Sequence, residues 1–454
     1  MPAAVHSPAA ISGGRLFVGC DDGRVYALDL DTGVRCWEFA PENGARVRSG
    51  PAVAEGVVVA AAANGFVYGL DESSGEERWR FRAGLSVTSS VGISGKQAFV
   101  AAYDGRVCAV SLARGELSWD FVIPGDFIAG SPAVGGGRVY VAALGTGEGG
   151  GTVYALDETT GAVQWKTPLQ GWLGNTAAFA GDRVVVAATG FKTGGLYALD
   201  SKTGAILWGP VRGASNQWSS PAVSADTVYA GNTGWLYAVD LGTGALKWRW
   251  KAPVASRRSG GRVSQYEALV RTPVISGDRL YIGSYFEIPG PDEIHVISSE
   301  TGEDLWSNEI PWRAGSGLSV ENGNVIIGGT GGEIEAWSPV DLIMNGKGVQ
   351  FQDIGPVLLE GRTWVPCRAM FEAAGFTVGW DSATRTVSCV AGGSSIVMTA
   401  GSPVALINGA EVVLDAPLRI MSDRVMAQPR AIVKALGGSI EWDPVKYNVF
   451  VRLE

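Results

Sequence analysis

A short sequence that ends in tryptophan recurs through most of the chain. The copy from Thr152 to Trp165 reads TVYALDETTGAVQW, two runs of alternating apolar residues on either side of Asp-x-x-Thr-Gly. Asp and Thr oxygens accept backbone N–H groups in tight turns, and Gly adopts the positive φ that returns the chain. The unit therefore predicts a β-hairpin. The tryptophans that end the copies are Trp37, Trp79, Trp119, Trp165, Trp208, Trp248 and Trp306.

The spacing of these tryptophans indicates the architecture. Successive tryptophans are 42, 40, 46, 43, 40 and 58 residues apart, and a period near ~40 is typical of propellers and solenoids. Glycine accounts for 65 of 454 residues, about twice the usual ~7%, which agrees with frequent tight turns. A tryptophan at the end of each repeat supplies a large apolar surface for packing one blade on the next. We assign these tryptophans structural roles.

Each repeat reads as four strands, here named A to D. Pro follows Ser, Gly or Thr at the start of strand A in several repeats, and an innermost propeller strand is an edge that tolerates Pro. Eight segments fit strand A, the last being Gly317–Val320, but only seven strand D returns occur. The sequence therefore predicts, over residues 1–338, an eight-bladed β-propeller of four-stranded antiparallel blades with an incomplete last blade. The best-defined repeat has strands Ser131–Val134, Val139–Ala142, Val153–Leu156 and Ala162–Trp165.

The incomplete blade suggests a hypothesis about the chain's start. The sequence opens almost directly into the first strand A. We hypothesise that a segment upstream of Met1 carries the missing strand and a signal peptide. On this hypothesis the lack of a targeting signal is uninformative.

Charge and hydropathy exclude two classes of partner. The net charge is −9 and the pI is about 5.0, which disfavours binding to nucleic acid or anionic lipid. The longest apolar run, Val57–Ala63, is far shorter than the ~18 residues of a membrane helix. We expect no nucleic-acid partner, no transmembrane segment and a monomer.

The repeat A-L-D-x-x-T-G-x-x-x-W, as in Ala155–Trp165 and Ala198–Trp208, resembles the pyrroloquinoline quinone (PQQ)-like β-propeller repeat. That family includes quinoprotein dehydrogenases and outer-membrane assembly lipoproteins. The dehydrogenases carry two adjacent cysteines over PQQ and Asp, Asn and Glu around calcium. No two cysteines are adjacent here, and no stretch matches the calcium ligands. The cysteines are Cys20, Cys36, Cys108, Cys367 and Cys389.

We therefore predict no catalytic residue, no bound cofactor and no metal site. Two alternatives stay open: a PQQ-dependent dehydrogenase with calcium, or its degenerate relative, and an envelope protein assembly factor. Cys20, Cys36 and Cys108 are interpreted as buried small apolar residues on strands, and a Cys367–Cys389 bridge is an alternative if the chain is exported. The sequence contains only two histidines, which disfavours a His-based catalytic triad. His295 is interpreted as a structural strand residue.

The repeats differ mainly in their connections. In an antiparallel four-stranded meander, A–B and C–D turns lie on one face, and B–C turns and D–A connections lie on the other. The second set holds the insertions, at Gly145–Gly151, Gly190–Gly195 and Ser284–Asp292, and from Trp248 to about Val270. Variable loops on a uniform scaffold are where function concentrates. We therefore expect a single ligand-binding face.

The same connections carry aromatic, Arg and amide side chains, the usual materials of a binding surface. They suit a protein segment or a cell-wall polysaccharide. The competing interpretation is that the tryptophans close blade rims and the arginines are merely solvated. The candidate residues are Arg46, Arg48, Trp172, Asn175, Asn216, Gln217, Trp218, Arg257, Arg258, Tyr266, Arg271, Trp312 and Arg313.

Residues 340–454 read as a duplication. Arg368 and Arg430 are 62 residues apart, as are the pairs Gly375/Gly437 and Trp380/Trp442. Each half predicts a short amphipathic helix, Ala369–Ala374 in the first, followed by a hairpin, so this is a small α+β domain. It is similar to the copper amine oxidase N-terminal-like domain, which implies an accessory module of exported proteins. No cluster of His ligands for copper is present.

Together these features predict an exported, non-catalytic binding or scaffold protein. We expect it outside the cell, on the cell surface or in the periplasm. Its propeller face would recognise a protein or cell-wall glycan, and its C-terminal domain would be an accessory or attachment module.

Overall fold

The protein is described by a computed structural model, which places residues 1–30, 32–124, 127–145, 150–190, 194–214, 219–259, 262–286, 292–310, 312–321, 324–337, 341–345, 347–349, 356–359, 362–421, 424–443 and 448–453. The chain forms two compact units. The larger contains Met1–Glu303 and the smaller contains Ala336–Glu454.

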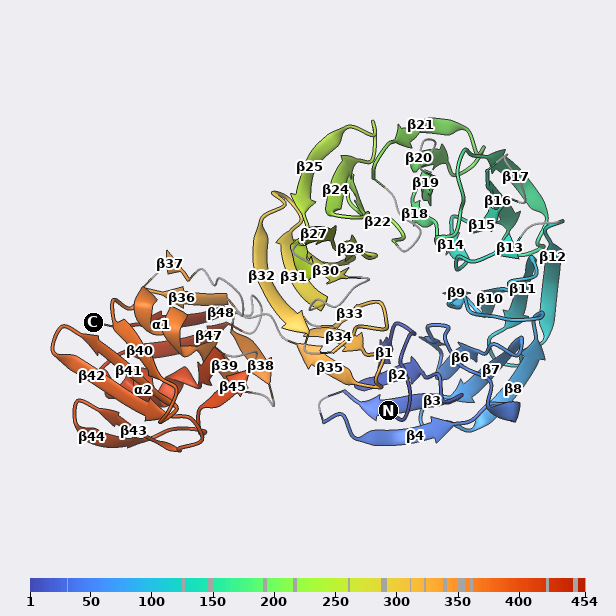
Figure 1. Ribbon diagram of the computed structural model, residues 1–454. Coiled ribbons are helices and arrows are strands. Elements are labelled where there is room, and N and C mark those ends of the chain that lie inside the picture. The colour runs from blue at the N-terminus through green and yellow to red at the C-terminus, as the bar shows by residue number, and fades with distance from the viewer. Residues whose placement is uncertain are drawn as a thin grey trace. The chain divides into compact units, whose positions relative to one another are not determined.

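The larger unit is a ring of antiparallel sheets whose first strands line the centre and whose last strands form the rim (Figure 1). The first four sheets are β1 (Ala10–Ser12) to β4 (Arg35–Phe39), with β2 (Arg15–Gly19) and β3 (Val25–Asp29); β5 (Ala52–Ala54), β6 (Val57–Ala61), β7 (Phe66–Asp71) and β8 (Glu77–Arg82); β9 (Gly92–Ser94), β10 (Gln97–Ala101), β11 (Arg106–Ser111) and β12 (Leu117–Val122); and β14 (Ala133–Gly135), β15 (Arg138–Leu144), β16 (Thr152–Asp157) and β17 (Val163–Pro168), with β13 (Phe127–Ile128) paired to β15.

The remaining sheets continue the pattern. They are β18 (Ala178–Ala180), β19 (Arg183–Ala188), β20 (Gly195–Asp200) and β21 (Ile206–Val211); β22 (Ala222–Ser224), β23 (Thr227–Gly231), β24 (Trp235–Asp240) and β25 (Leu246–Lys251); β29 (Val274–Ser276), β30 (Arg279–Tyr285), β31 (Asp292–Ser298) and β32 (Asp304–Ile310), with β28 (Leu269–Val270) paired to β30; and the three-stranded β33 (Ser319–Glu321), β34 (Asn324–Gly328) and β35 (Ile334–Trp337). The predicted eight-bladed propeller with an incomplete last blade is confirmed.

Two details differ from the sequence-based expectation. Strand A begins after the Ser-Pro dipeptide rather than at it, so that Pro132 precedes β14. Proline lacks the N–H that a ladder position would use. The insertion after Trp248 contains a hairpin of β26 (Val254–Ser259) and β27 (Arg262–Glu267). The short helix η1 (Glu42–Gly44) lies in the first D–A connection.

Each of the first six blades is attached to the next through its strand D tryptophan. The Trp119 ring packs against Gly161 of the next C–D turn, where an added Cβ would lie 2.5 Å from the ring. The Trp119 Nε1–H donates to the carbonyl of Glu158 at 2.9 Å. This bond recurs from Trp37 to Glu72, Trp79 to Leu112, Trp165 to Ser201, Trp208 to Leu241 and Trp248 to Ser299. These contacts link the six tryptophans to the next blade, and the structural role assigned to all seven stays a prediction.

A chain of hydroxyl groups links the inner ends of the blades. In each link, a backbone N–H donates to the side-chain hydroxyl at the same position in the next blade. The links run from Gly50 to Ser90, Ser131, Thr176, Ser220 and Thr272, at 2.8 to 3.1 Å. These bonds satisfy backbone donors where the first strands crowd the axis.

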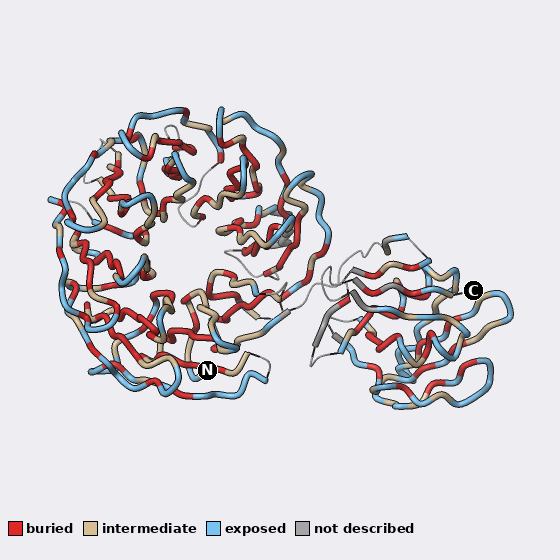
Figure 2. Tube along the Cα trace, turned by 180° about the vertical axis from the view of Figure 1, so that it is seen from behind, coloured by how far each residue is buried: buried red, intermediate tan, exposed pale blue. Residues whose placement is uncertain are grey.

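The ring closes through the start of the chain. The Val5 N–H donates to the Gly329 carbonyl at 3.0 Å, and the Ser319 hydroxyl donates to the Ala9 carbonyl at 2.7 Å. Val5, Cys20 and Ile326 share one hydrophobic cluster. Buried residues lie mainly in the middle strands, and exposed ones along the rim (Figure 2).

The smaller unit is α+β. Its helices are α1 (Cys367–Ala373) and α2 (Pro429–Ala435), and each is followed by a glycine with positive φ, Gly375 and Gly437. A tight turn lies at Asn408 and Gly409, with positive φ at both residues. The strands are β36 (Asp341–Met344), β37 (Lys347–Gly348), β38 (Val357–Leu359), β39 (Arg362–Pro366), β40 (Thr377–Asp381), β41 (Thr386–Ala391), β42 (Ser394–Thr399), β43 (Val404–Ile407), β44 (Ala410–Val413), β45 (Arg419–Met421), β46 (Arg424–Ala427), β47 (Ser439–Asp443) and β48 (Asn448–Arg452). The boundary near residue 339 stays a prediction.

Candidate functional site

Hydrogen bonds between connections define the two faces of the ring. On one face, C–D turns bond to A–B turns of the same blade, as from the Glu158 N–H to the Gly137 carbonyl. On the other, D–A connections bond to B–C turns. Trp172 and Thr189 exchange two backbone bonds there, and the Thr330 N–H donates to the Arg313 carbonyl. We call the first the turn face and the second the insertion face.

The insertion face exposes large apolar side chains on its third to fifth blades. Leu85 is 71% exposed and Trp172 is 61% exposed, and both lie on D–A connections. The exposed rings of Tyr103 and Phe127 stack with centroids 5.1 Å apart. The Tyr103 N–H donates to the Ser86 carbonyl, next to Leu85. We call Leu85, Tyr103, Phe127 and Trp172 the apolar group of the insertion face.

Basic side chains occupy other connections of the same face. The Arg48 guanidinium forms a two-point contact with Asp21, with Nε–Oδ1 at 2.8 Å and Nη2–Oδ2 at 2.6 Å. The hydrogen bond from Arg48 lowers the pKa of Asp21. His6 lies 3.8 Å from Asp21 and contacts the Gly315 carbonyl through Nδ1. Arg48 is therefore neutralised within the protein.

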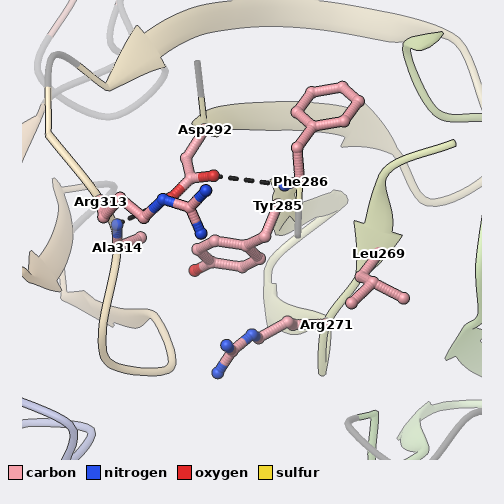
Figure 3. A pocket seen from close by; sticks show the side chains of 7 residues that line it. All are labelled: Leu269, Arg271, Tyr285, Phe286, Asp292, Arg313 and Ala314. Carbon is pink, nitrogen blue, oxygen red and sulfur yellow. Dashed lines mark hydrogen bonds between the residues drawn. The ribbon is translucent and has the colours of Figure 1, made fainter. Parts of the chain in front are cut away.

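A cavity of about 200 Å³ lies beside the seventh and eighth blades. Figure 3 shows the Arg271 and Arg313 side chains on either side of the Tyr285 ring in this view. Arg271 is on the D–A connection before β29, and Arg313 is on the one before β33. The cavity is lined by Leu269, Arg271, Tyr285, Phe286, Asp292, Arg313 and Ala314.

Burial dominates the electrostatics of this cavity. Asp292 is 3% exposed, and burial raises its pKa against the opposing effect of two backbone hydrogen bonds. Those bonds come from Ala314 at 2.8 Å and Phe286 at 3.3 Å. Burial also raises the pKa of Tyr285 to about 12, so its hydroxyl stays protonated and donates to the Ser316 carbonyl at 3.3 Å.

The cavity exists because the seventh blade departs from the repeat. In the second blade, Ser49 occupies the place of Arg271, and its hydroxyl bonds both the N–H and the carbonyl of Ala61. In the seventh blade the Arg271 N–H bonds the Gly283 carbonyl at 3.2 Å. A Cβ on Gly283 would lie 2.5 Å from the Tyr285 hydroxyl oxygen, so glycine leaves room for the ring. The Arg271 guanidinium lies over that ring, 4.5 Å from its centroid.

The structure brings together only some of the predicted site residues. Arg271 and Arg313 share the cavity, whereas Arg46, Arg48 and Trp172 lie on other connections. Asn175 is buried, Tyr266 is half-buried on β27, and Trp312 donates to Glu335 at 3.2 Å. Asn216, Gln217 and Trp218 lie outside the described residues, as do the side chains of Arg257 and Arg258.

Sequence reasoning missed Asp292, Tyr285 and a buried polar cluster behind the cavity. His295 Nε2 lies 3.2 Å from the Ser284 hydroxyl and 3.1 Å from Glu293 Oε2. Because both partners contact the same ring nitrogen, and Ser284 and His295 are buried, the cluster does not have the relay order of a nucleophilic triad. The ring also lies 4.8 Å from Trp250, which agrees with the predicted structural role of His295.

The described residues do not fit the quinone and calcium of the dehydrogenases. All five cysteines are free thiols, including Cys367 and Cys389 in the core of the smaller unit. Cys20 and Cys108 are buried, whereas Cys36 is exposed on β4, so the expectation that Cys36 is buried is wrong. Burial raises the pKa of Cys108 to about 12, so this thiol stays protonated at neutral pH, and no cysteine lines the cavity. Among the described residues, no group of three or more His, Cys, Asp or Glu side chains is arranged to hold a metal. No helix within the described ranges is long and apolar enough to cross a membrane.

Comparisons with known proteins agree with this architecture. The chain is similar to tetrathionate hydrolase of Acidithiobacillus ferrooxidans, with 24% identity over 224 residues, 46% of this chain and 42% of that protein. The match thus spans less than half the length of this curated relative. The chain resembles the crystal structure of BamB from Moraxella catarrhalis, with a TM-score of 0.50, 19% identity, and coverage of 62% of this chain and 80% of that one.

It also resembles quinohemoprotein alcohol dehydrogenase from Comamonas testosteroni, with a TM-score of 0.51, 13% identity, and coverage of 72% and 70%. Likeness at these identities establishes the fold alone. The family profile described as copper amine oxidase N-terminal domain matches residues 343–451. The profile described as outer membrane protein assembly factor BamB matches residues 3–129 and 124–339. Because this profile covers most of the sequence, the chain belongs to the family of outer membrane protein assembly factor BamB, with a copper amine oxidase N-terminal domain after the propeller.

Proposed function

We propose that this protein is an exported, non-catalytic scaffold of the cell envelope whose insertion face binds another protein. The observation that carries the proposal is the apolar group. Leu85, Tyr103, Phe127 and Trp172 all lie on D–A connections or B–C turns. Contiguous exposed apolar patches mark interaction sites, and here the stacked Tyr103 and Phe127 rings lie beside the connection that carries Leu85. Aromatic side chains such as that of Trp172 are enriched at binding hot spots.

Family membership supports a protein as the partner, because the matched profile is named for an assembly factor. On the turn face, the repeated Asp and Thr side chains are hydrogen-bonded within their own turns, although Val34 is 64% exposed there. The C-terminal domain, for which we propose the boundary near residue 339, serves as an accessory or attachment module. A cell-wall glycan is the other ligand class.

The test compares capture by two matched triple variants of the immobilised full chain. One variant is Leu85→Ser, Phe127→Ser and Trp172→Ser on the insertion face. The control is Val163→Ser, Ile206→Ser and Leu246→Ser on outer strands, where the side chains are 42%, 50% and 52% exposed. We expect a bacterial envelope extract to yield a protein that the wild type and control retain and the first variant loses. Equal loss in both variants, or retention of purified peptidoglycan instead, would contradict a protein-binding insertion face.

A further inference from the structure

The cavity between Arg271 and Arg313 has the size of one amino-acid residue. Its volume of about 200 Å³ lies below the ~300–1,000 Å³ typical of small-molecule and cofactor sites. It opens on the insertion face, because Arg271 and Arg313 both lie on D–A connections. A short group projecting from a larger partner fits this space better than a free cofactor.

The charges at the cavity favour an anion. Its lining has two guanidinium groups and one carboxylate, Asp292. Two backbone N–H groups already bond that carboxylate. Neither guanidinium forms a hydrogen bond or ion pair with any residue that the structure describes, and Arg271 instead lies over Tyr285. Guanidinium groups bind carboxylates through two parallel hydrogen bonds.

The rest of the lining is apolar. Leu269, Phe286 and Ala314 contribute to the wall, and the Tyr285 ring is almost completely buried. A ligand that fills the cavity therefore needs a carboxylate and an apolar group on one short unit. The C-terminal residue of a polypeptide has both, whereas an internal Asp or Glu has no separate apolar side chain and its main chain continues in two directions.

We propose that this cavity binds the C-terminal residue of a protein partner. Arg313 binds the α-carboxylate, Arg271 adds positive charge from the other side of the Tyr285 ring, and an apolar side chain lies against Leu269 and Phe286. Asp292 is a positioning residue, because its bonds to the Phe286 and Ala314 N–H groups fix two of the cavity's connections. The inference rests on the proposed protein-binding function and specifies which part of the partner is recognised.

The test is fluorescence anisotropy of the full chain with a labelled Gly-Ser-Gly-Ser-Ala-Leu peptide. We expect the peptide with a free C-terminal carboxylate to bind at least about tenfold more tightly than its amide, since charge-assisted hydrogen bonds are lost on amidation. An amidated peptide that ends in Glu has a side-chain carboxylate but no α-carboxylate. It therefore tests whether an acidic side chain, rather than the C-terminus, supplies the carboxylate that binds. Equal binding of acid and amide, binding of neither, or preference for the Glu amide would overturn the proposal.

Variants locate the peptide. Arg313→Gln and Arg271→Gln should each weaken binding by about tenfold, and Arg313→Lys should restore part of it. Arg48→Gln is the matched control, because Arg48 is already paired with Asp21, and it should leave peptide binding unchanged. Arg313 is exposed on a connection, so its variant should keep the wild-type melting temperature. Equal weakening by Arg48→Gln would overturn the assignment to this cavity. If the partner protein is still captured through the apolar group while no peptide binds, the inference fails and the proposed function stands.

Discussion

The turn face and the insertion face are built from the same strands, yet they differ in how their residues are used. On the turn face, one set of contacts is repeated: Asp157 accepts from Thr160, and Trp119 donates to Glu158. On the insertion face, the connections share the repeated hydroxyl links at the inner ends of the blades, but their lengths and their exposed apolar and Arg side chains differ from blade to blade. The comparison indicates that the repeated contacts hold the ring together and that the remaining residues of the insertion face are free to vary.

The largest expected effect is on the turn face, from Gly161→Ala. Gly161 has φ +72°, and its added Cβ would lie 2.5 Å from the Trp119 ring. Gly137, also on the turn face, has φ +73° but open space around it. We expect a loss of about 3 kcal/mol in the free energy of unfolding for Gly161→Ala and about 1 kcal/mol for Gly137→Ala, measured by equilibrium urea unfolding. Equal losses would show that the Trp–Gly contact does not hold the blades together.

A smaller effect is expected from removing the tryptophan hydrogen bond. Trp119→Phe keeps a ring but loses the bond to the Glu158 carbonyl. The matched control is Trp306→Phe, because Trp306 is also buried but its Nε1 has no partner among the described residues. Trp119→Phe should lower the free energy of unfolding, measured by urea unfolding, by about 1 kcal/mol more than the control does. If Trp306→Phe lowers the free energy of unfolding as much as Trp119→Phe does, the Trp119 hydrogen bond makes no specific contribution to stability.

The aspartates of the turn face should make stability depend on pH. The backbone N–H and then the hydroxyl of Thr160 lower the pKa of Asp157, and the Thr203 hydroxyl lowers that of Asp200. A lowered pKa in the folded state means that the unfolded state binds more protons. The contribution is therefore present above the ordinary carboxyl pKa of ~3.9 and is lost as pH falls below it. The urea midpoint should decrease between pH 5 and 3, and Asp157→Asn should make that decrease shallower. A midpoint independent of pH would contradict this role.

The propeller could be predicted from the sequence because its period, its Asp-x-x-Thr-Gly turns and its terminal tryptophans are local signals. Strand parity also predicted which connections share a face. The cavity could not be predicted, because it joins Arg271, Asp292 and Arg313, which are far apart in the sequence and differ from the repeat. One signal was available: Arg271 stands directly before a Thr-Pro pair, where the second blade has Ser49. An alignment of the repeats on this position would have singled it out.

The smallest stability effect should come from the insertion face. Trp172 is 61% exposed, so Trp172→Ala should change the free energy of unfolding by less than about 0.5 kcal/mol, as measured by urea unfolding. The same substitution should weaken partner binding. A large loss of stability would make Trp172 a blade-closing residue, as the competing sequence interpretation held.

The most direct test of the central claim is photo-crosslinking from single positions in the assembled complex. A crosslinking amino acid replaces Leu85, Tyr103 or Trp172 on the insertion face, or Val163, Ile206 or Leu246 on the outer strands. We predict adducts with the partner protein from the first three positions and none from the last three. Adducts from the outer strands, with none from the insertion face, would contradict the assignment of the insertion face as the binding surface.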